Sequence, residues 1–398
     1  MTKTLLVDNG ANTIKVGHIQ LRAPKIVPNV IVRGRTDRRY FIADQLDQCT
    51  DFSSLYYRLP FEKGYLTNWG AERTIWDRVF NHVVKADPSD TQLVVTEPFF
   101  NLPAIQEAYD QILFEEYGFQ ACYRTTAPQL CVFNEWSALF KDESDRLPDA
   151  CVVVDSGYSF THIAPFAHQR PIAKGIRRVN VGGKLLTNQL KETVSFRHYD
   201  MMEETYIINN VKETCCFVSQ DALVDLATSR LPPDGNPILQ EYVLPDFTNT
   251  TRGHIRQNEP LQPDQQVLVM NNERFMIPEI LMHPSDIGME QAGISETIVQ
   301  SVQACDPEYH GLMYANILLV GGNANMPGYK DRIEQDLRQL VPTCFDIRIA
   351  TPADATVAGW MGGQRMMQRM SKSELQQRFV TRNEYLEHGS DICRRKFA

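Results

Sequence analysis

Two stretches of the chain, far apart in sequence, share one pattern of apolar and polar positions. Residues 152–162 begin with a run of β-branched residues, break at Asp-Ser-Gly (155–157) and resume as a second strand-like run. Residues 5–17 repeat this design, with the break at Asp-Asn-Gly (8–10). A strand, a glycine-containing turn and a second strand predict a tight antiparallel hairpin in each stretch. The repetition indicates an internal duplication.

Short apolar strands followed by amphipathic segments surround both hairpins. A buried strand at 93–96 precedes a helix that we expect to start near Asn101, and a strand at 317–320 precedes a helix with apolar residues at i, i+4 and i+7 (333, 337 and 340). Asn68 is a helix-start signal for a further helix that reaches about residue 85. Alternation of strand and helix predicts an α/β fold.

The second half contains further elements and one unusual segment. We expect a strand at 176–181, a helix that starts at 182–183 and a second helix at 206–217. A last helix at 357–370 is followed by a charged tail. The polar segment 141–145 marks the boundary between the halves. Residues 247–264 are polar, contain proline and lack apolar periodicity, which indicates a surface insertion. Two interpretations of this insertion stay open: a solvated loop, or a contact surface for a partner subunit.

Composition agrees with a folded protein of two domains. With 398 residues the chain is too long for a single hydrophobic core. Its composition, 43% hydrophobic and 22% charged residues, is ordinary for a globular protein and includes no tract typical of disorder. The formal net charge of −9 excludes a surface that attracts a phosphate backbone everywhere. The short basic clusters at 33–39 and 394–396 are interpreted as solvated faces.

The cysteines and the apolar runs indicate the cellular compartment of the protein. Nine scattered cysteines, with no Cys-x-x-Cys pairing, favour reduced thiols over a disulfide framework or a zinc site. No apolar run approaches the length of a membrane span, and the first residues resemble neither a secretory leader nor an anchor. We therefore expect a cytosolic or nuclear protein.

The glycine-containing turns suggest a binding chemistry. Glycine lets backbone N–H groups converge into a nest that binds anions, and phosphate is the natural guest. Asp8 and Asp155, one in each turn, could hold the waters of a Mg²⁺ ion beside the phosphates, and Lys15 adds a cation. A single Asp-x-Gly hairpin is more often only structural, but two hairpins together with Gly321 and Gly322 favour a phosphate site.

His162 follows the second turn and has two interpretations. It could serve as a catalytic base beside the phosphates. A lone histidine after a strand is more often a packed, hydrogen-bonded side chain, so its neighbours must decide.

Several motifs identify a family resemblance that spans nearly the whole chain. Residues 5–10, 64–69, 154–162, 271–275 and 320–323 resemble the corresponding motifs of actins. Within that superfamily, residues 155–162, 181–187 and 112–117 resemble the nuclear actin-related protein 6 subfamily.

The resemblance implies the fold of actin, hexokinase and Hsp70-type ATPases, with two duplicated α/β halves and four subdomains around a nucleotide cleft. The boundaries that it implies are residues 1–28, 61–134 and 358–398 for subdomain 1, 29–60 for a shortened subdomain 2, 135–181 and 290–357 for subdomain 3, and 182–289 for subdomain 4 with the insertion 247–264.

The resemblance also implies a set of residues for ATP or ADP with Mg²⁺. These residues are Asp8, Gly10, Asn12, Lys15, Asp155, Gly157, Tyr158, Ser159, Gly183, Lys212, Glu213, Gly321, Gly322 and Met326. Asp8 and Asp155 would hold the metal through water.

The chain departs from the actin pattern at several of these positions. Ala11 and Asn12 follow the first turn where actins have serine and glycine, and Tyr158 and Ser159 replace an aspartate and a glycine in the second turn. On the adenosine side, actin's tyrosine and two lysines are replaced by Met326, Thr356 and Thr214.

The departure with the greatest consequence for catalysis is Ala127, which aligns with the glutamine that positions the attacking water in actins. Alanine has no group to orient a water, and positioning supplies much of the rate of phosphoryl transfer. We therefore expect no catalytic residues, despite the retained Asp155 and His162, and nucleotide binding with little or no hydrolysis.

The function implied by the resemblance is that of a scaffold. The subfamily implies a nuclear, and also cytoplasmic, subunit of an SWR-type chromatin-remodelling complex that deposits a variant histone in nucleosomes. Its partners would include the motor ATPase and a small zinc-finger subunit, with nucleosome contact and no membrane. Asp286 at the position of actin's apolar plug and the short segment 29–60 argue against a homopolymer.

Two other function classes remain as alternatives. One is an autonomous ATP-hydrolysing or filament-forming actin-like protein, and the other is a sugar kinase or chaperone on the same fold. Nothing in the sequence beyond the shared loops suggests a sugar kinase or a chaperone.

Overall fold

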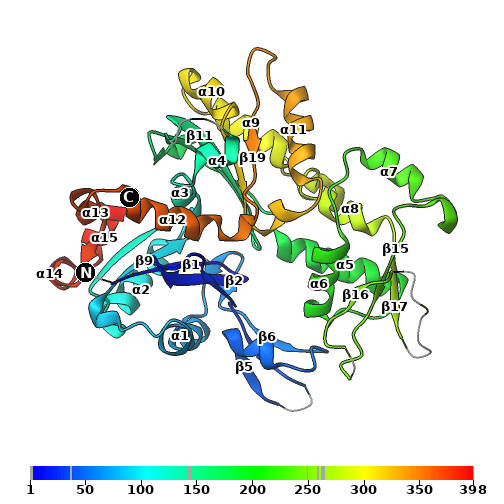
Figure 1. Cartoon of the computed structure of the whole chain (residues 1–398), viewed down its shortest axis with the longest axis horizontal. Helices are drawn as coiled ribbons and strands as arrows, with labels where there is room; N and C mark the ends of the chain where they lie inside the picture. The colour runs from blue at the N-terminus through cyan, green and yellow to red at the C-terminus, as the bar shows by residue number, and fades with distance from the viewer. Residues whose placement is uncertain are drawn as a thin grey trace.

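Two α/β halves lie next to each other in the computed structural model, and each is built on a six-stranded sheet (Figure 1). The structure describes residues 3–35, 38–141, 143, 146–248, 250–257, 260 and 265–397. Within these residues no helix is long and apolar enough to cross a membrane.

The first half contains the N-terminal hairpin. Strands β1 (Lys3–Asn9) and β2 (Thr13–His18) pair antiparallel, and Asp8 lies opposite Lys15. The sheet order is β20-β10-β9-β1-β2-β3, completed by β3 (Lys25–Pro28), β9 (Thr91–Glu97), β10 (Ala121–Thr126) and β20 (Val380–Thr381). Because β1, β9 and β10 run parallel, their carboxyl ends meet at one edge of the sheet.

The second half repeats this plan. Strands β11 (Ala150–Ser156) and β12 (Thr161–Ala167) form the second hairpin, and β18 (Ile317–Val320) runs parallel to β11. The sheet continues to β19 (Ile349–Ala350) on one side and to β13 (Arg170–Pro171) and β14 (Arg177–Val179), which both pair with β12, on the other. Both predicted hairpins and the α/β organisation are therefore confirmed.

Helices cover both sheets. In the first half these are α1 (Trp69–Arg78), continued by a π-helical turn (Val79–Val83), α2 (Pro103–Gln111), continued by another (Ile112–Glu116), α3 (Ala127–Cys131) and α12 (Ala358–Arg369). The second half has α4 (Trp136–Phe140), α9 (Ile294–Gln303), α10 (Pro307–Tyr314) and α11 (Tyr329–Leu340). One apolar core joins the halves, with Leu6, Val153 and Trp360 fully buried in it.

Each half carries a smaller lobe, the first at the bottom of Figure 1 and the second at its right. The first lobe has the sheet β5-β4-β6, made of β4 (Ile31–Arg33), β5 (Tyr40–Ile42) and β6 (Tyr56–Arg58). A short hairpin of β7 (Phe61–Glu62) and β8 (Tyr65–Leu66) leads back to the first sheet. The second lobe contains α5 (Gly183–Arg197), α6 (Thr205–Cys215), α7 (Ala222–Thr228), α8 (Glu273–Glu279) and the sheet β16-β15-β17.

The insertion at 247–264 is more ordered than its sequence indicated. Its described residues include β16 (His254–Ile255), which pairs with β15 (Gln240–Val243), and β15 in turn pairs with β17 (Val267–Met270). Phe247 packs against apolar cores of both lobes. A wholly solvated loop is thus wrong for this part, while residues 249, 258, 259 and 261–264 lie outside the described residues.

The C-terminal segment is folded, although its sequence predicted only a charged tail. It forms α13 (Lys372–Arg378), α14 (Arg382–His388) and α15 (Ser390–Phe397), and β20 joins the first sheet between α13 and α14. Capping boxes, Ser371 with Glu374 and Thr381 with Glu384, start two of these helices. The boundary segment 141–145 lies only partly within the described residues.

Candidate functional site

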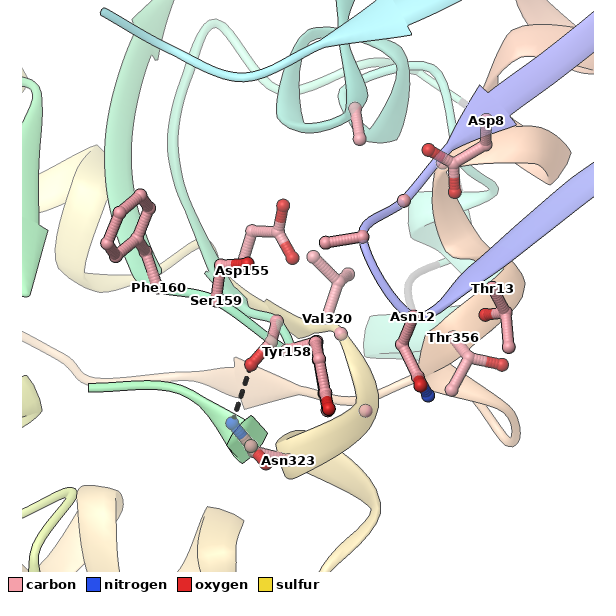
Figure 2. A pocket seen from close by; sticks show the side chains of 18 of the residues that line it. Asp8, Asn12, Thr13, Asp155, Tyr158, Ser159, Phe160, Val320, Asn323 and Thr356 are labelled. Atoms are coloured by element: carbon pink, nitrogen blue, oxygen red, sulfur yellow. Dashed lines mark hydrogen bonds between the residues drawn. The ribbon is translucent and has the colours of Figure 1, made fainter. Parts of the chain in front are cut away.

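A cleft of about 500 Å³ lies between the halves, where the turns of both hairpins face each other (Figure 2). All fourteen residues that the sequence predicted for a nucleotide site line it, as do Ala127 and His162. Those fourteen are Asp8, Gly10, Asn12, Lys15, Asp155, Gly157, Tyr158, Ser159, Gly183, Lys212, Glu213, Gly321, Gly322 and Met326. The fold thus collects residues from six separate segments into one site.

The first turn is fixed by Thr96, at the end of β9. Its hydroxyl accepts a hydrogen bond from the backbone N–H of Asn9 at 2.8 Å and donates one to the Asp8 carboxylate at 2.9 Å. The ammonium of Lys15 lies above the turn, 3.7 Å from the place that a Cβ on Gly10 would occupy. The buried Asp8 is therefore held in one orientation beside a cation.

The second turn is braced by two neighbouring glycine segments. The N–H of Gly183 donates to the carbonyl of Gly157 at 3.0 Å, and the side-chain amide of Asn323 donates to the same carbonyl at 3.0 Å, as the dashed line in Figure 2 marks. A Cβ on Gly321, whose φ is +89°, would lie 2.4 Å from the carbonyl oxygen of Ser156. Only glycine permits this close approach.

Two carboxylates face the same part of the cleft from opposite halves (Figure 2). Burial, and then the nearby charge of Asp8, raise the pKa of Asp155 to about 6, while Lys15 lowers it. An acidic pair of this kind gains stability from a bound cation. Among the described residues no group of three His, Cys, Asp or Glu side chains could hold a metal alone. The donor set thus fits Mg²⁺ that is held mainly by phosphates and water, with Asp8 and Asp155 as its protein partners.

Lys212 has a different role from a direct ligand. Its buried ammonium donates to the carbonyl of Gly183 at 3.1 Å, to the Thr187 hydroxyl at 2.9 Å and to the Asn209 amide oxygen at 2.9 Å. An ammonium has three protons, and these three bonds use all of them. Lys212 therefore lines the cleft and supports the helix N-terminus at Gly183, but has no donor left for a ligand.

Tyr158 narrows the cleft. Its ring lies against Gly183, 3.5 Å from the position of a Cβ there, and burial raises the pKa of its phenol to about 12, with Glu213 adding to the shift. The phenol is therefore neutral at pH 7. A neutral, apolar ring stands where a carboxylate would offer two acceptors.

His162 is enclosed by aromatic rings. The centroids of Phe99 and Phe160 lie 5.9 and 6.0 Å from that of its ring, and its Nε2 is buried without a hydrogen-bond partner. Burial, helped by the charge of Arg178, lowers the pKa of His162 to about 4. A histidine with this pKa is a weak base at pH 7. The nearby Ala127 offers only a methyl group, so no side chain at that position can orient a water toward Nε2.

Several contributing residues were not predicted from the sequence. Thr96 and Asn323 position the two turns, and Phe99 and Phe160 surround His162. Thr96 ends a predicted strand whose carboxyl end points at the cleft, which is a usable signal for a site residue. Asn323 and Phe99 carry no such signal, because their partners, Gly157 and His162, lie far away in the sequence. Phe160 lies two residues before His162, but the sequence does not show that its ring faces the imidazole.

Comparison with known proteins identifies the family. The actin family model matches residues 1–398, the whole chain. Actin-related protein 6 of Drosophila melanogaster is 40% identical over 390 residues, covering 97% of each chain. Actin-like protein ARP6 of Cryptococcus neoformans is 40% identical over 416 residues, covering 99% of this chain and 84% of its own. Actin-related protein 6 of Oryza sativa subsp. japonica is 34% identical over 431 residues, covering 99% of this chain and 98% of its own.

Proposed function

Because the chain belongs to the actin family and groups there with the actin-related protein 6 sequences, we propose that it is a scaffold subunit that retains Mg²⁺-ATP or Mg²⁺-ADP without using it. The observation that carries this proposal is the contrast within one cleft. Both turns keep their aspartate and glycine and are braced, whereas the water-positioning side chain is replaced by Ala127 and His162 is a neutral, weakly basic group.

The intact part of the site supports binding. The backbone amides of both turns and the Lys15 ammonium would contact phosphate oxygens, and Asp8 and Asp155 would hold the hydrated metal. Bound Mg²⁺ would neutralise phosphate charge. A ligand that binds only the folded state stabilises it by mass action, by about 2.7 kcal/mol at a concentration one hundred times the Kd. Retained nucleotide would therefore fasten the two halves together.

The purified protein is expected to release close to one equivalent of adenine nucleotide when it is denatured, and to hydrolyse ATP far more slowly than filamentous actin. Mass spectrometry of the released nucleotide and a phosphate-release assay measure the two quantities. Asp155→Asn should lower the nucleotide content, because it removes one of two metal partners. Exposed Asp331 on α11, replaced in the same way, is the matched control.

Two results would contradict this proposal. One is a protein that leaves purification without nucleotide and shows no thermal stabilisation by Mg²⁺-ATP. The other is turnover comparable with that of filamentous actin which Asp155→Asn abolishes. Restoring the missing group by Ala127→Gln is a further check, since a raised rate would locate the deficiency at this position.

We further propose that the scaffold serves in a nuclear SWR-type chromatin-remodelling complex that deposits a variant histone. The support is the similarity to actin-related protein 6 sequences over nearly the full chain. In this proposal the motor ATPase and a small zinc-finger subunit bind the chain, and the complex contacts the nucleosome. Co-purification of the tagged chain from nuclear extract tests it, and recovery of the chain free of remodelling subunits would count against it.

The alternative is a filament-forming actin-like protein. Asp286 is exposed on a 3-10 turn (Pro284–Ile287) at the position of actin's apolar plug. Burying an unpaired carboxylate costs several kcal/mol, on the order of 3 or more, which disfavours that contact. We therefore expect the protein to stay in the supernatant when it is centrifuged at high concentration with Mg²⁺-ATP. Reversible pelleting of the native protein would favour the filament-forming alternative. If Asp286→Leu did not increase the pelleted fraction, Asp286 would not be what opposes filament formation.

A further inference from the structure

The two small lobes touch each other across the open side of the cleft. Residues 52–54 of the first lobe meet the start of α6 and Phe247 of the second lobe. These segments are more than 140 residues apart in sequence, so the contact joins the two halves of the molecule directly (Figure 1).

A carboxylate makes the first part of this contact. Glu204, immediately before α6, accepts hydrogen bonds from the backbone N–H of Ser54 at 3.1 and 3.0 Å and from the Ser54 hydroxyl at 2.9 Å. Hydrogen bonds to a charged acceptor are stronger than those between neutral groups. One side chain of the second lobe thus fixes both the backbone and the side chain of a residue in the first.

The backbone of Ser54 is adapted to this contact. Its φ is +46°, in the left-handed region that residues other than glycine seldom adopt. In this conformation its N–H and its hydroxyl point to the same carboxylate. Such a conformation persists when surrounding contacts hold it, and Glu204 supplies them.

Aromatic stacking makes the second part. The ring of Phe52 stacks on that of Tyr206 with centroids 4.1 Å apart and planes inclined by 15°, and Phe247 lies 6.4 Å from Phe52 at a tilt. Phe52 is only 5% exposed, and Tyr206 and Phe247 pack against the core cluster of the first lobe. Opening the contact would expose Phe52 to water.

The first lobe depends on this contact for its own core. That core contains seven buried residues: Val30, Val32, Phe41, Leu46, Cys49, Phe52 and Leu55. A lobe of about thirty residues cannot bury enough apolar surface to be stable alone. Two residues of the opposite lobe complete it, which makes closure favourable without any ligand.

The contact lies next to the nucleotide cleft. Tyr57, on β6, is buried, and burial together with Tyr158 of the cleft and Tyr206 and Glu204 of the contact raises the pKa of its phenol. Tyr57 therefore lies near both. The same helix α6 that carries Tyr206 carries Lys212 and Glu213, which line the cleft.

We propose that Phe52, Ser54, Glu204, Tyr206 and Phe247 form a latch that holds the cleft closed even without nucleotide and limits the rate at which a bound nucleotide leaves. The second clause rests on the proposed function, since it requires a nucleotide. The first clause does not, so the two can fail separately.

Hydrogen exchange on the nucleotide-free full-length chain tests closure. The amide of Ser54 should be protected in the native protein, and Glu204→Ala should increase its exchange rate by at least tenfold. Glu204 belongs to the second lobe, so this variant removes no side chain from the core of the first lobe. Glu203→Ala is the matched control, because Glu203 pairs only loosely with Arg35, at 3.8 Å and with both side chains exposed. A Ser54 amide that exchanges freely in the native protein would overturn the latch.

Dissociation of a fluorescent ATP analogue tests the effect on release. Glu204→Ala and Phe52→Ala should each increase the dissociation rate by about tenfold or more, and Glu203→Ala should leave it unchanged. An unchanged rate in a variant whose Ser54 amide has lost protection would overturn control of release by the latch. A chain that binds no nucleotide at all would refute the proposed function, while the exchange result would still decide on closure.

Discussion

Replacement of Glu72 by glutamine is expected to stabilise the protein at pH 8, raising the free energy of unfolding by about 3 kcal/mol. Glu72 lies in α1 and is fully buried below the first phosphate turn. Its Oε1 accepts a hydrogen bond of 2.6 Å from the side-chain amide of Asn9. Its Oε2 is buried without a partner.

The neighbouring Asn29 explains why a neutral side chain fits better here. The amide of Asn29 donates to the carbonyl of Gly10 at 3.1 Å and lies against the Glu72 carboxyl, and its own Oδ1 is also buried without a partner. Oε2 of Glu72 and Oδ1 of Asn29 are thus two buried acceptors without a donor. A protonated Glu72 adds a donor to this region, and the NH₂ of a glutamine would add one at every pH. Rotating Asn29 instead would leave the Gly10 carbonyl without its donor.

The direction of the pH dependence follows from the pKa. Burial is the main cause that raises the pKa of Glu72 from 4.5 to about 7, against hydrogen bonds that lower it. Between these two values the folded state binds more protons than the unfolded state, so stability falls as pH rises through this window. Glutamine does not titrate. The stability difference between variant and native protein should therefore be small near pH 4.5, grow up to about pH 7 and stay constant above it.

Urea denaturation at a series of pH values measures this difference. Glu62→Gln, at an exposed position on β7, should show no such pH-dependent gain. A Glu72→Gln variant that is less stable than the native protein at pH 8, or a difference that does not change with pH, would mean that the carboxyl is ionised in the fold.

The parts of the fold that were predictable are those with a local signal. The hairpins appear in the sequence as β-branched runs interrupted by Asp-x-Gly, and the cleft residues in these two turns carry that local signal. Lys212 and Glu213, in the last turn of α6, have no such signal and were named only from the family resemblance. The turns are short and their geometry depends on glycine, so sequence and structure correspond closely there.

The parts that escaped prediction depend on distant partners. Glu72 reads as an exposed helix residue, since nothing nearby in sequence shows that Asn9 and Asn29 cover it. Phe247 reads as part of a polar loop until Phe52 is placed beside it. The C-terminal helices did have local signals, the two capping boxes, and these outweigh the high charge of the segment.

Replacement of Arg124 by alanine is expected to destabilise the protein by about 3 to 5 kcal/mol, because it leaves two buried carboxylates without a cation. The Arg124 side chain is 2% exposed and lies 2.6 Å from a carboxylate oxygen of Glu97 and 3.2 Å from one of Asp110. It joins β10 to the end of β9 and to α2. Glu97 lines the cleft, so this triad supports the edge of the sheet on which the first phosphate turn rests.

The charges of Arg124, Glu97 and Asp110 indicate which second substitution should recover stability after Arg124 is lost. Burial raises the pKa of Asp110 to about 6 even though Arg124 lowers it, so without the guanidinium this carboxyl would take up a proton more readily. Adding Asp110→Asn to Arg124→Ala should therefore recover part of the lost stability, since it removes one unpaired charge. The stability of Arg124→Lys should lie between those of the native protein and Arg124→Ala, because one ammonium cannot bind two carboxylates as a forked guanidinium does.

Chemical denaturation of the three variants against Arg73→Ala decides this prediction. Arg73 pairs with Glu116 at 2.7 Å on the surface, where 52% and 36% of the two side chains are exposed, and its loss should cost no more than about 1 kcal/mol. If Arg124→Ala cost as little as Arg73→Ala, the net contribution of the triad to stability would be close to zero. The cost of desolvating its three charges would then cancel the gain from their attraction. A large loss that Asp110→Asn partly recovers would instead show that Arg124 is required to keep two acidic side chains inside the first half, next to the cleft.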